Sequence, residues 1–320
     1  MATSRFQNLR IAGIATSVPG PSRPVAETAG IPADAAAKVS ASTGVSRRHT
    51  VADNVCTSDL CRHAAENLLL ETGWDKTSID ALIFVSQTPD YFLPATACSL
   101  HGKLNLPVTC AAFDVNLGCS GYVYGLWLAS MMITSGMKRV ILLAGDTISR
   151  IASPVDKSVA LLFGDAGSAT AIEASPNGRS WWFELGTDGS GANHLIVPAG
   201  GFRKPADEQT QRPSEREGGN IRSDENLYMD GGEIFAFTLA RVPKLCRSVM
   251  EAAGWEMDDV TRFIMHQANR FMLRHLSRQM TIPEARFVVA LEEYGNTSSA
   301  SIPMAMSTSM GSVLQEPARL

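Results

Sequence analysis

The sequence predicts an α/β protein in which a sheet is covered by helices on both faces. Largely apolar runs of strand length occur at 81–85, 110–116 and 139–146, and helical patterns separate them. Strands that are apolar on both faces are typical of a sheet buried between two helical layers. A similar order of elements also occurs twice along the chain, which indicates two related halves.

Length and charge exclude several classes of protein. The chain has 320 residues, 45% of them hydrophobic, which is enough for a large core in two domains or two halves of one fold. The net charge is −4 and no basic run exceeds Arg47-Arg48, so we expect neither a nucleic-acid-binding nor a membrane protein. No apolar run reaches the length of a membrane span, and we expect no secretory signal.

The cysteines indicate the compartment. All six lie outside any disulfide framework or zinc-binding spacing. Free thiols fit a reducing environment. We therefore expect a cytoplasmic protein without a metal site.

The first half begins with a strand at 9–16 and continues with a helix. Thr57 is the expected N-cap of this helix, and Gly73 is its expected end. After the strand at 81–85, a second helix is expected to start near Ala95. Each strand is thus followed by a helix that returns the chain across the sheet.

The middle of the chain contains a small-residue motif and a polar segment. Phe163-Gly164-Asp165 lies between two apolar strand candidates within 159–174, where small residues let backbones approach closely. The segment 200–228 is rich in charge, Gly and Pro. We interpret it as a long loop or insertion that either covers a pocket or is simply solvated.

The repeat divides the chain into halves at 1–175 and 176–320. Each half contains a helix that ends at Gly-Trp, an acidic turn, a strand and a polar loop. The repeat places His266 and Asn296 on the same side of the molecule as Cys119, at the ends of strands. Loops at the carboxyl ends of buried strands are where open α/β sheets bind ligands.

Cys119 lies in the turn between a strand and a helix at 121–133 that is apolar on nearly every face. We expect this helix to be buried in a large core. Its N-terminus would favour a thiolate and any oxyanion formed beside it. Free cysteines are more often buried and inert, so Cys119 alone is weak evidence.

His266 and Asn296 strengthen this interpretation. His266 follows a buried strand in FIMHQAN, and Asn296 lies where a strand turns into a helix in EEYGNTSSASIP. A thiolate at Cys119 attacks a thioester, and N–H donors from His and Asn stabilise the negative charge that follows. We assign His266 chiefly this electrophilic role, because a helix that lowers the thiol pKa would make a general base unnecessary.

Five blocks occur in the order DVNLGCSGYVYGL, GDTISR, FGDAGSA, HQAN and YGNTSSASIP. With them the chain resembles β-ketoacyl-acyl carrier protein synthase III, in the thiolase-like superfamily. The resemblance implies a five-layered αβαβα fold of two similar halves and a homodimer. It implies that Cys119 takes an acyl group from a coenzyme A thioester, and that His266 and Asn296 promote decarboxylation of a malonyl thioester on acyl carrier protein. It implies no metal or redox cofactor.

The resemblance also implies substrate-binding residues. By position these are Leu93, which reaches into the partner subunit's pocket, and Leu162, Phe163, Gly231 and Phe235. Leu93 stands where the family often has Phe. The smaller side chain predicts a longer or branched acyl primer.

For coenzyme A, Arg150 in GDTISR matches an arginine that contacts adenine in the family. Lys38 and Ser42 stand where members that use acetyl-CoA carry a Trp and an Arg, so we expect an altered adenine site. A basic face for the acidic carrier protein, or a merely solvated helix surface, is expected from Arg270, Arg274 and Arg278. The family's Gly-rich FGxG loop donates an oxyanion N–H, and the chain given ends at Leu320 before such a motif.

Two alternatives stay open. One is an acyltransferase on this fold that moves the acyl group to an alcohol or amine, and the other is a catalytically silent partner subunit. Asn296 favours decarboxylation, because transfer to a hydroxyl has no enolate to stabilise. Fatty-acid initiation and a specialised biosynthetic pathway are both compatible with the sequence, as are carrier protein and coenzyme A as bearers of the extender.

Overall fold

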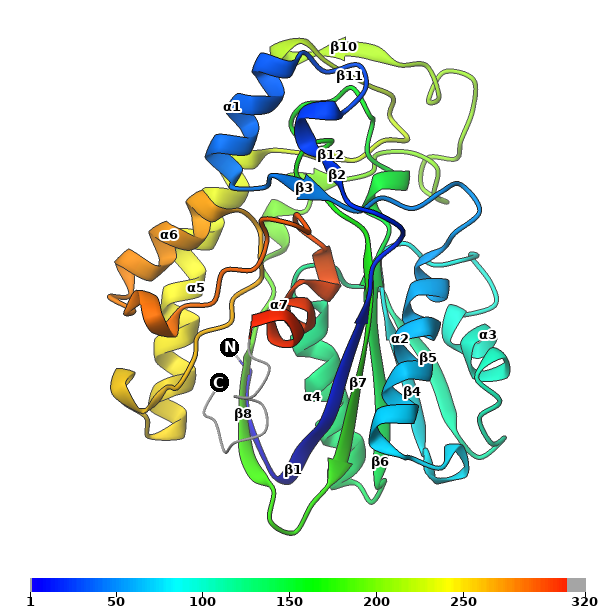
Figure 1. Cartoon of the computed structure of the whole chain (residues 1–320), viewed down its shortest axis with the longest axis vertical. Helices are drawn as coiled ribbons and strands as arrows, with labels where there is room; N and C mark the ends of the chain where they lie inside the picture. The colour runs from blue at the N-terminus through cyan, green and yellow to red at the C-terminus, as the bar shows by residue number, and fades with distance from the viewer. Residues whose placement is uncertain (1, 310–320) are drawn as a thin grey trace.

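The computed structural model describes residues 2–309 and contains a six-stranded mixed sheet (Figure 1). The strand order is β5-β4-β6-β7-β1-β8. Strands β5, β4 and β6 are parallel, whereas β7, β1 and β8 pair antiparallel with their neighbours. The strands are β1 Ala2–Ser17, β4 Ala81–Val85, β5 Ala111–Val115, β6 Arg139–Asp146, β7 Ala166–Ala174 and β8 Arg179–Leu185. The strands predicted from the three apolar runs are confirmed.

The helices form layers on both sides of this sheet. They are α1 Ala33–Thr43, α2 Thr57–Thr72, α3 Thr96–Lys103, α4 Gly121–Thr134, α5 Gly231–Ala253, α6 Arg270–Gln279 and α7 Ser301–Ser309. Helices α2 and α3 cover one face of the sheet, and α4 and α7 cover the other (Figure 1). Helices α5 and α6 pack together beyond α7, with α5 against β8.

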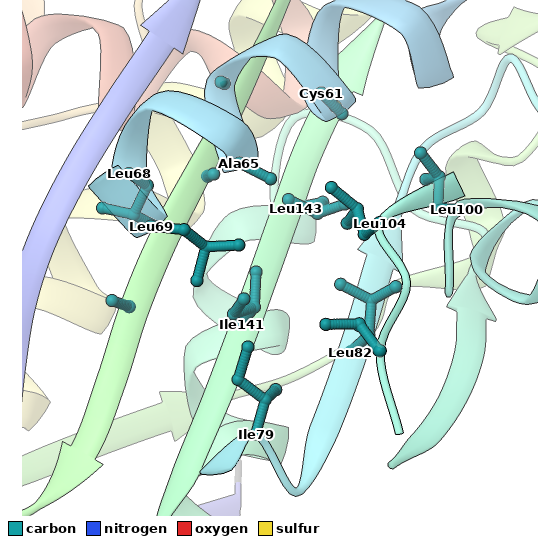
Figure 2. Close-up of a cluster of buried hydrophobic side chains, with 14 of the residues drawn as sticks. Cys61, Ala65, Leu68, Leu69, Ile79, Leu82, Leu100, Leu104, Ile141 and Leu143 are labelled. Atoms are coloured by element: carbon teal, nitrogen blue, oxygen red, sulfur yellow. The ribbon is translucent and has the colours of Figure 1, made fainter. Parts of the chain in front are cut away.

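The core between α2 and the sheet shows why this layer forms. Cys61, Ala65 and Leu68 repeat at helical spacing along α2 and point toward Ile141 and Leu143 of β6 (Figure 2). All five side chains are fully buried. Burying a large aliphatic side chain stabilises the fold by about 1.5–3 kcal/mol, so this stripe holds the helix on the sheet.

The two ends of α2 can be compared with the predicted N-cap and the predicted C-terminal glycine. The helix stops at Gly73, which adopts a positive φ of 65° as expected. The predicted N-cap at Thr57 is wrong by one residue, because Cys56 caps the helix and its N–H donates to Asp59 Oδ2 at 3.0 Å. The Thr57 hydroxyl instead hydrogen-bonds the side chain of Thr88 at 2.8 Å.

Helix α4 is less buried than predicted. Gly121, Tyr122, Gly125, Ala129 and Ile133 form one buried face. The apolar side chains on its other faces are half-buried in the described part of the chain. The expectation of burial on nearly every face is therefore wrong.

The second half repeats part of the first. Helix α5 ends at Gly254 with a φ of 67°, and a short 3-10 turn at Met257–Asp259 follows, as Lys76–Ser78 follows α2. The predicted strands before His266 and before Asn296 are wrong as regular strands. Within residues 2–309 these segments are joined by the single parallel bridge between Phe263 and Phe287.

Side-chain hydrogen bonds connect the segment before His266 to the segment before Asn296, where backbone hydrogen bonds between paired strands were expected. Gln267 is buried, and its Nε2 donates to Met265 O at 2.7 Å and to Val288 O at 3.3 Å. Its Oε1 accepts from Ala290 N at 2.8 Å. One glutamine thus holds the segment that carries His266 beside the segment that leads to Asn296.

The strand expected before Phe163 is also wrong. Residues 159–162 form turns, in which Ala160 N donates to Asp156 O at 2.8 Å and Asp156 Oδ1 accepts from Ser158 N at 2.9 Å. The backbone and side-chain oxygens of Asp156 therefore stabilise a turn in the segment where a strand was expected. The close approach expected from the small residues is confirmed, because a Cβ added to Gly164 would lie 2.0 Å from Tyr294 O.

The polar segment 200–228 is an exposed surface loop, as predicted, with one short hairpin in it. The hairpin pairs β10 Ser214–Arg216 with β11 Asn220–Arg222. The remaining short strands are β2 Arg23–Pro24, β3 Arg47–Arg48, β9 Leu195–Ile196 and β12 Tyr228–Met229. Across residues 2–309, no helix combines the length and the hydrophobicity that crossing a membrane requires. The end of the predicted second half, after Ser309, lies outside the described residues.

Candidate active site

Cys119 lies between the end of β5 and the start of α4 and lines a cavity of about 300 Å³. Polar side chains in the cavity wall are Gln87, Asn116 and Ser298. The apolar part of the wall is formed by Ile148, Ile151, Phe163, Leu195, Ile196, Val197 and Leu227. Such a cavity suits a ligand with an apolar chain and a polar group.

The turn at Cys119 is shaped by its glycine neighbour. A Cβ added to Gly118 would lie 2.1 Å from Gln87 Oε1 and 3.2 Å from Ser298 Oγ. Only a residue without a side chain lets these two groups approach the backbone beside Cys119. The turn therefore packs directly on the segment that follows Asn296.

The amide of Asn296 has a defined orientation. Its side-chain oxygen accepts from the backbone N–H of Ser298 at 2.9 Å, and Asn296 is 4% exposed. A backbone N–H only donates, so the atom that faces it is Oδ1 and the NH2 group is the opposite end. Ser298 adopts a positive φ of 51°, an uncommon backbone conformation that is often found at functional sites.

His266 is half-buried, and only one of its two ring nitrogens has a hydrogen-bond partner within residues 2–309. Nδ1 lies 2.6 Å from Ser301 Oγ, and the buried Nε2 has no hydrogen-bond partner among residues 2–309. Burial lowers the pKa of His266 to about 4, so the ring is neutral near pH 7. A neutral ring with a free donor fits the electrophilic role predicted for it.

The segment 296–301 is connected to each of the three predicted catalytic residues. Ser298 contributes to the same cavity wall as Cys119, while Ser301 holds His266 and Ser298 holds Asn296. His266 and Asn296 do not themselves line this cavity. Each is joined by a hydrogen bond to a serine of the 296–301 segment.

The thiol of Cys119 differs from its prediction. Its pKa is raised to about 11, chiefly by burial and in addition by the charge of Asp146, while a backbone hydrogen bond opposes the shift. This direction is opposite to the lowered pKa that the helix N-terminus predicts. A lowered pKa of Cys119 was the reason for giving His266 no role as a general base, and the raised pKa removes that reason.

Asp146 is a buried carboxyl that the sequence reasoning did not single out. Its Oδ1 accepts from Gln87 N at 2.7 Å and from Ser86 Oγ at 3.1 Å, and its Oδ2 accepts from Ser299 N at 3.1 Å. Burial raises the pKa of Asp146, and the hydrogen bonds oppose this shift. The group joins the loop after β4 to the 296–301 segment.

The pocket residues predicted by resemblance divide into two groups. Phe163 lines the cavity, and the carbonyl of the neighbouring Leu162 accepts from Asn296 N at 2.9 Å. Gly231 and Phe235 lie on α5 outside the cavity wall, and Phe235 packs on Phe271 with ring centroids 5.3 Å apart.

The remaining predicted residues do not line the cavity. Arg150 donates to Val55 O at 3.2 Å, and Leu93 is 82% exposed. Arg270 pairs with Glu292 at 2.9 Å, whereas the other two arginines of the predicted basic face are exposed on α6. No group of acidic, His or Cys side chains within residues 2–309 could hold a metal ion.

Several residues of the site were missed from the sequence. They are Gln87, Asn116, Asp146, Gln267, Ser298 and Ser301. Ser298 and Ser301 lie in the run of small residues after Asn296, and their hydroxyl groups could have been recognised there as possible hydrogen-bond partners. Nothing in the local sequence indicated that Asp146 would meet that run.

The fold and site define a condensing enzyme of the thiolase fold. A sequence profile of 3-oxoacyl-[acyl-carrier-protein] synthase III matches residues 113–189, and the profile of its C-terminal part matches residues 250–315. A putative 3-oxoacyl-[acyl-carrier-protein] synthase 3 of Campylobacter jejuni is 38% identical over 261 residues, covering 81% of this chain and 74% of the relative. The chain belongs to the 3-oxoacyl-[acyl-carrier-protein] synthase III family.

Solved structures agree. A 3-oxoacyl-(acyl-carrier protein) synthase from Burkholderia xenovorans LB400 has a TM-score of 0.92 at 47% identity and covers 99% of this chain and 89% of its own. The synthase III from Pseudomonas aeruginosa PAO1 has a TM-score of 0.79 at 27% identity, covering 96% and 90%. The predicted thiolase-like fold is therefore confirmed.

Proposed function

We propose that the protein condenses an acyl group, carried on Cys119, with a malonyl thioester of acyl carrier protein. The acyl donor is a coenzyme A thioester. The product is a 3-oxoacyl thioester, formed at the start of fatty-acid synthesis or of a specialised pathway. No metal or redox cofactor takes part in the proposed reaction.

In the first step the sulfur of Cys119 attacks the acyl-CoA carbonyl, and coenzyme A leaves with the proton of the Cys119 thiol. The acyl group is then bound to Cys119 as a thioester. Because the pKa of the free thiol is about 11, the proton must leave as the new bond forms. The apolar wall of the cavity supports an acyl chain longer than acetyl.

In the second step the malonyl carboxylate leaves as CO2, and its bonding electrons form an enolate at the thioester. The enolate carbon attacks the carbonyl of the acyl-cysteine, and the Cys119 thiolate leaves and is protonated by solvent. We infer that His266 Nε2 and the amide NH2 of Asn296 stabilise the enolate oxygen. The unpaired, buried Nε2 and the fixed orientation of the Asn296 amide support this inference.

The observation that supports this proposal is a pair of neutral nitrogen groups, His266 and Asn296, each hydrogen-bonded to the segment whose Ser298 lines the same cavity as Cys119. A carboxylate in their place would repel the substrate carboxylate and the enolate. Transfer of the acyl group to an alcohol or amine would need a base at the acceptor, and neither Asn296 nor a buried His266 with a pKa of about 4 suits that role.

Mass spectrometry of the protein after incubation with a panel of acyl-CoAs tests the first step. We expect an acyl adduct on Cys119 that disappears when malonyl-acyl carrier protein is added, with release of CO2 and a 3-oxoacyl product. An adduct that moves to an alcohol or amine would support the acyltransferase instead. Absence of any adduct would support the silent subunit.

We further propose a homodimer in which Leu93 contributes to the partner's pocket. Two features support it. The loop with Tyr91, Phe92 and Leu93 exposes 65%, 80% and 82% of these apolar side chains, and Phe92 packs on the 92% exposed Phe202. Strand β5 also lies at the edge of the sheet, where unpaired backbone groups are available to a second chain.

A further inference from the structure

We propose that Ser301 is a positioning residue that fixes His266 as an Nε2–H donor for the enolate oxygen. This inference rests on the condensation proposed above. It adds a residue that touches neither the substrate nor Cys119 and acts through the imidazole alone.

The contact between the two residues is short and protected from water. Ser301 is the first residue of α7 and is 1% exposed, and its Oγ lies 2.6 Å from His266 Nδ1. The same Oγ lies 3.4 Å from the backbone nitrogen of Gln267. Because Gln267 is held by three further hydrogen bonds, the Ser301 hydroxyl faces a fixed donor.

This arrangement assigns the hydrogens. The backbone N–H of Gln267 only donates, so Ser301 Oγ acts as its acceptor. Within residues 2–309, the sole acceptor in reach of the Ser301 hydroxyl hydrogen is His266 Nδ1. A neutral imidazole that accepts at Nδ1 carries its hydrogen on Nε2. The tautomer is thus set by the hydrogen-bond network.

The consequence concerns the other nitrogen. His266 Nε2 is buried and has no partner among the described residues, so its N–H is an unpaired donor in a dry setting. Such a group is costly to leave unpaired and gains most when a ligand oxygen arrives. The opposite tautomer would present a lone pair to the enolate oxygen and repel it. With Asn296 as second donor, the Nε2–H form completes the pair.

Two measurements on the wild-type protein and Ser301→Ala test the proposal. The first is 15N–1H NMR of the imidazole rings, with the His266 signals assigned through His266→Gln. We expect the wild-type ring to be the Nε2–H tautomer and the Ser301→Ala ring to be a mixture. A wild-type ring protonated at Nδ1 would overturn the proposal, and so would a pure Nε2–H ring in Ser301→Ala.

The second measurement separates the two half-reactions. Ser301→Ala should lower kcat for condensation with malonyl-acyl carrier protein about tenfold, less than the 10²–10³ typical of deleting an oxyanion donor. Acylation of Cys119 by acyl-CoA should change less than about twofold. Ser301→Thr keeps the hydroxyl and should restore the condensation rate. Equal losses in both half-reactions, or no rescue by Thr, would contradict a positioning role.

Ser130→Ala is the matched control. Ser130 is also a buried helical serine, but its Oγ donates to Leu126 O and contacts no histidine. Its removal should change neither the tautomer nor the ratio of the half-reactions. If the wild-type protein forms no 3-oxoacyl product, the condensation proposal fails, whereas the NMR result still decides whether Ser301 sets the tautomer.

Discussion

Asn296 is joined to Phe163 by a single parallel bridge. Asn296 N donates to Leu162 O at 2.9 Å, and Gly164 N donates to Asn296 O at 3.1 Å. Phe163 lines the cavity that Cys119 also lines. The bridge therefore fixes the backbone of Asn296 relative to the cavity that Cys119 lines, although Asn296 and Phe163 belong to different halves of the sequence.

The bridge depends on Gly164. A methyl group at this position would lie 2.0 Å from Tyr294 O, a backbone atom that cannot move independently. We expect Gly164→Ala to lower the free energy of unfolding by about 3 kcal/mol and to impair condensation, because the bridge must open. Urea unfolding and steady-state kinetics measure the two effects.

Gly102→Ala serves as the control for this substitution. Gly102 lies in α3, and a Cβ there has open space around it. This change should stabilise the protein by about 0.5–1 kcal/mol, since Ala is the better helix former. A Gly164→Ala protein as stable and active as Gly102→Ala would show that the bridge is dispensable.

The orientation of Asn296 permits a test of its NH2 group alone. In Asn296→Asp one oxygen still accepts from Ser298 N, but a carboxylate oxygen replaces the donor. We expect decarboxylation of malonyl-acyl carrier protein to fall about 10²- to 10³-fold, because the enolate loses one of two donors and meets a negative charge. Acylation of Cys119 should persist.

Release of CO2 in the absence of an acyl primer measures this loss directly, and the mass of the protein after acyl-CoA treatment checks the first step. The comparison variant Asn296→Ala removes both the donor and the acceptor. If Asn296→Asp decarboxylates as fast as the wild-type protein, the amide is not an oxyanion donor and the proposed second step is wrong.

The sequence was most informative where burial alone decides structure. Strands β4 and β6 are buried on both faces, so their apolar runs predicted them almost residue for residue. Similar apolar runs at Phe263 and Val288 predicted strands that form one bridge, because the side chain of Gln267 makes the connection. A hydrophobic pattern in the sequence does not show which backbone N–H and C=O groups form hydrogen bonds with a neighbouring strand.

The site shows the same division. The three candidate catalytic residues could be singled out because Cys, His and Asn at strand ends suit acyl chemistry. The protonation states of these residues could not be predicted from the sequence, because they depend on burial and on groups that are distant in the chain. Asp146 raises the pKa of Cys119 from another strand end, and Ser301 reaches His266 across a gap of 35 residues in the chain.

His266 should make the protein's stability depend on pH. Its pKa is about 4 in the folded protein against an ordinary value of 6.5, so the unfolded chain binds the proton more readily. The stabilisation is complete above pH 6.5 and is lost as the pH falls toward 4. We expect the loss to reach at most about 3 kcal/mol.

Carboxylates titrate in the same range, so the measurement is a comparison. Urea unfolding of the wild-type protein and of His266→Gln at pH 7.5, 6 and 5 isolates the contribution of this ring. The wild-type protein should lose more stability than the variant as the pH falls. Parallel curves would mean that the imidazole is accessible to solvent and not held neutral by burial.

Leu93 allows a matched test of the proposed dimer. Leu93 and Leu70 are both 82% exposed, but Leu93 lies in the apolar loop after β4 and Leu70 lies on α2. Leu93→Glu should weaken self-association in sedimentation experiments, because a charge would be buried in the interface. Leu70→Glu should not. Equal sedimentation of both variants and the wild-type protein would contradict a role of this loop in assembly.

The raised pKa of Cys119 predicts how its reactivity changes with pH. Only the thiolate reacts with iodoacetamide, and with a pKa of about 11 its fraction rises about tenfold per pH unit between pH 7 and 10. Mass spectrometry of the peptide that contains Cys119 gives the rate free of contributions from the other five thiols, and Cys119→Ala identifies the adduct. The rate should show no plateau below pH 10. A plateau below pH 9 would mean that the N-terminus of α4 outweighs burial, so that Cys119 begins the reaction as a thiolate and needs no proton acceptor.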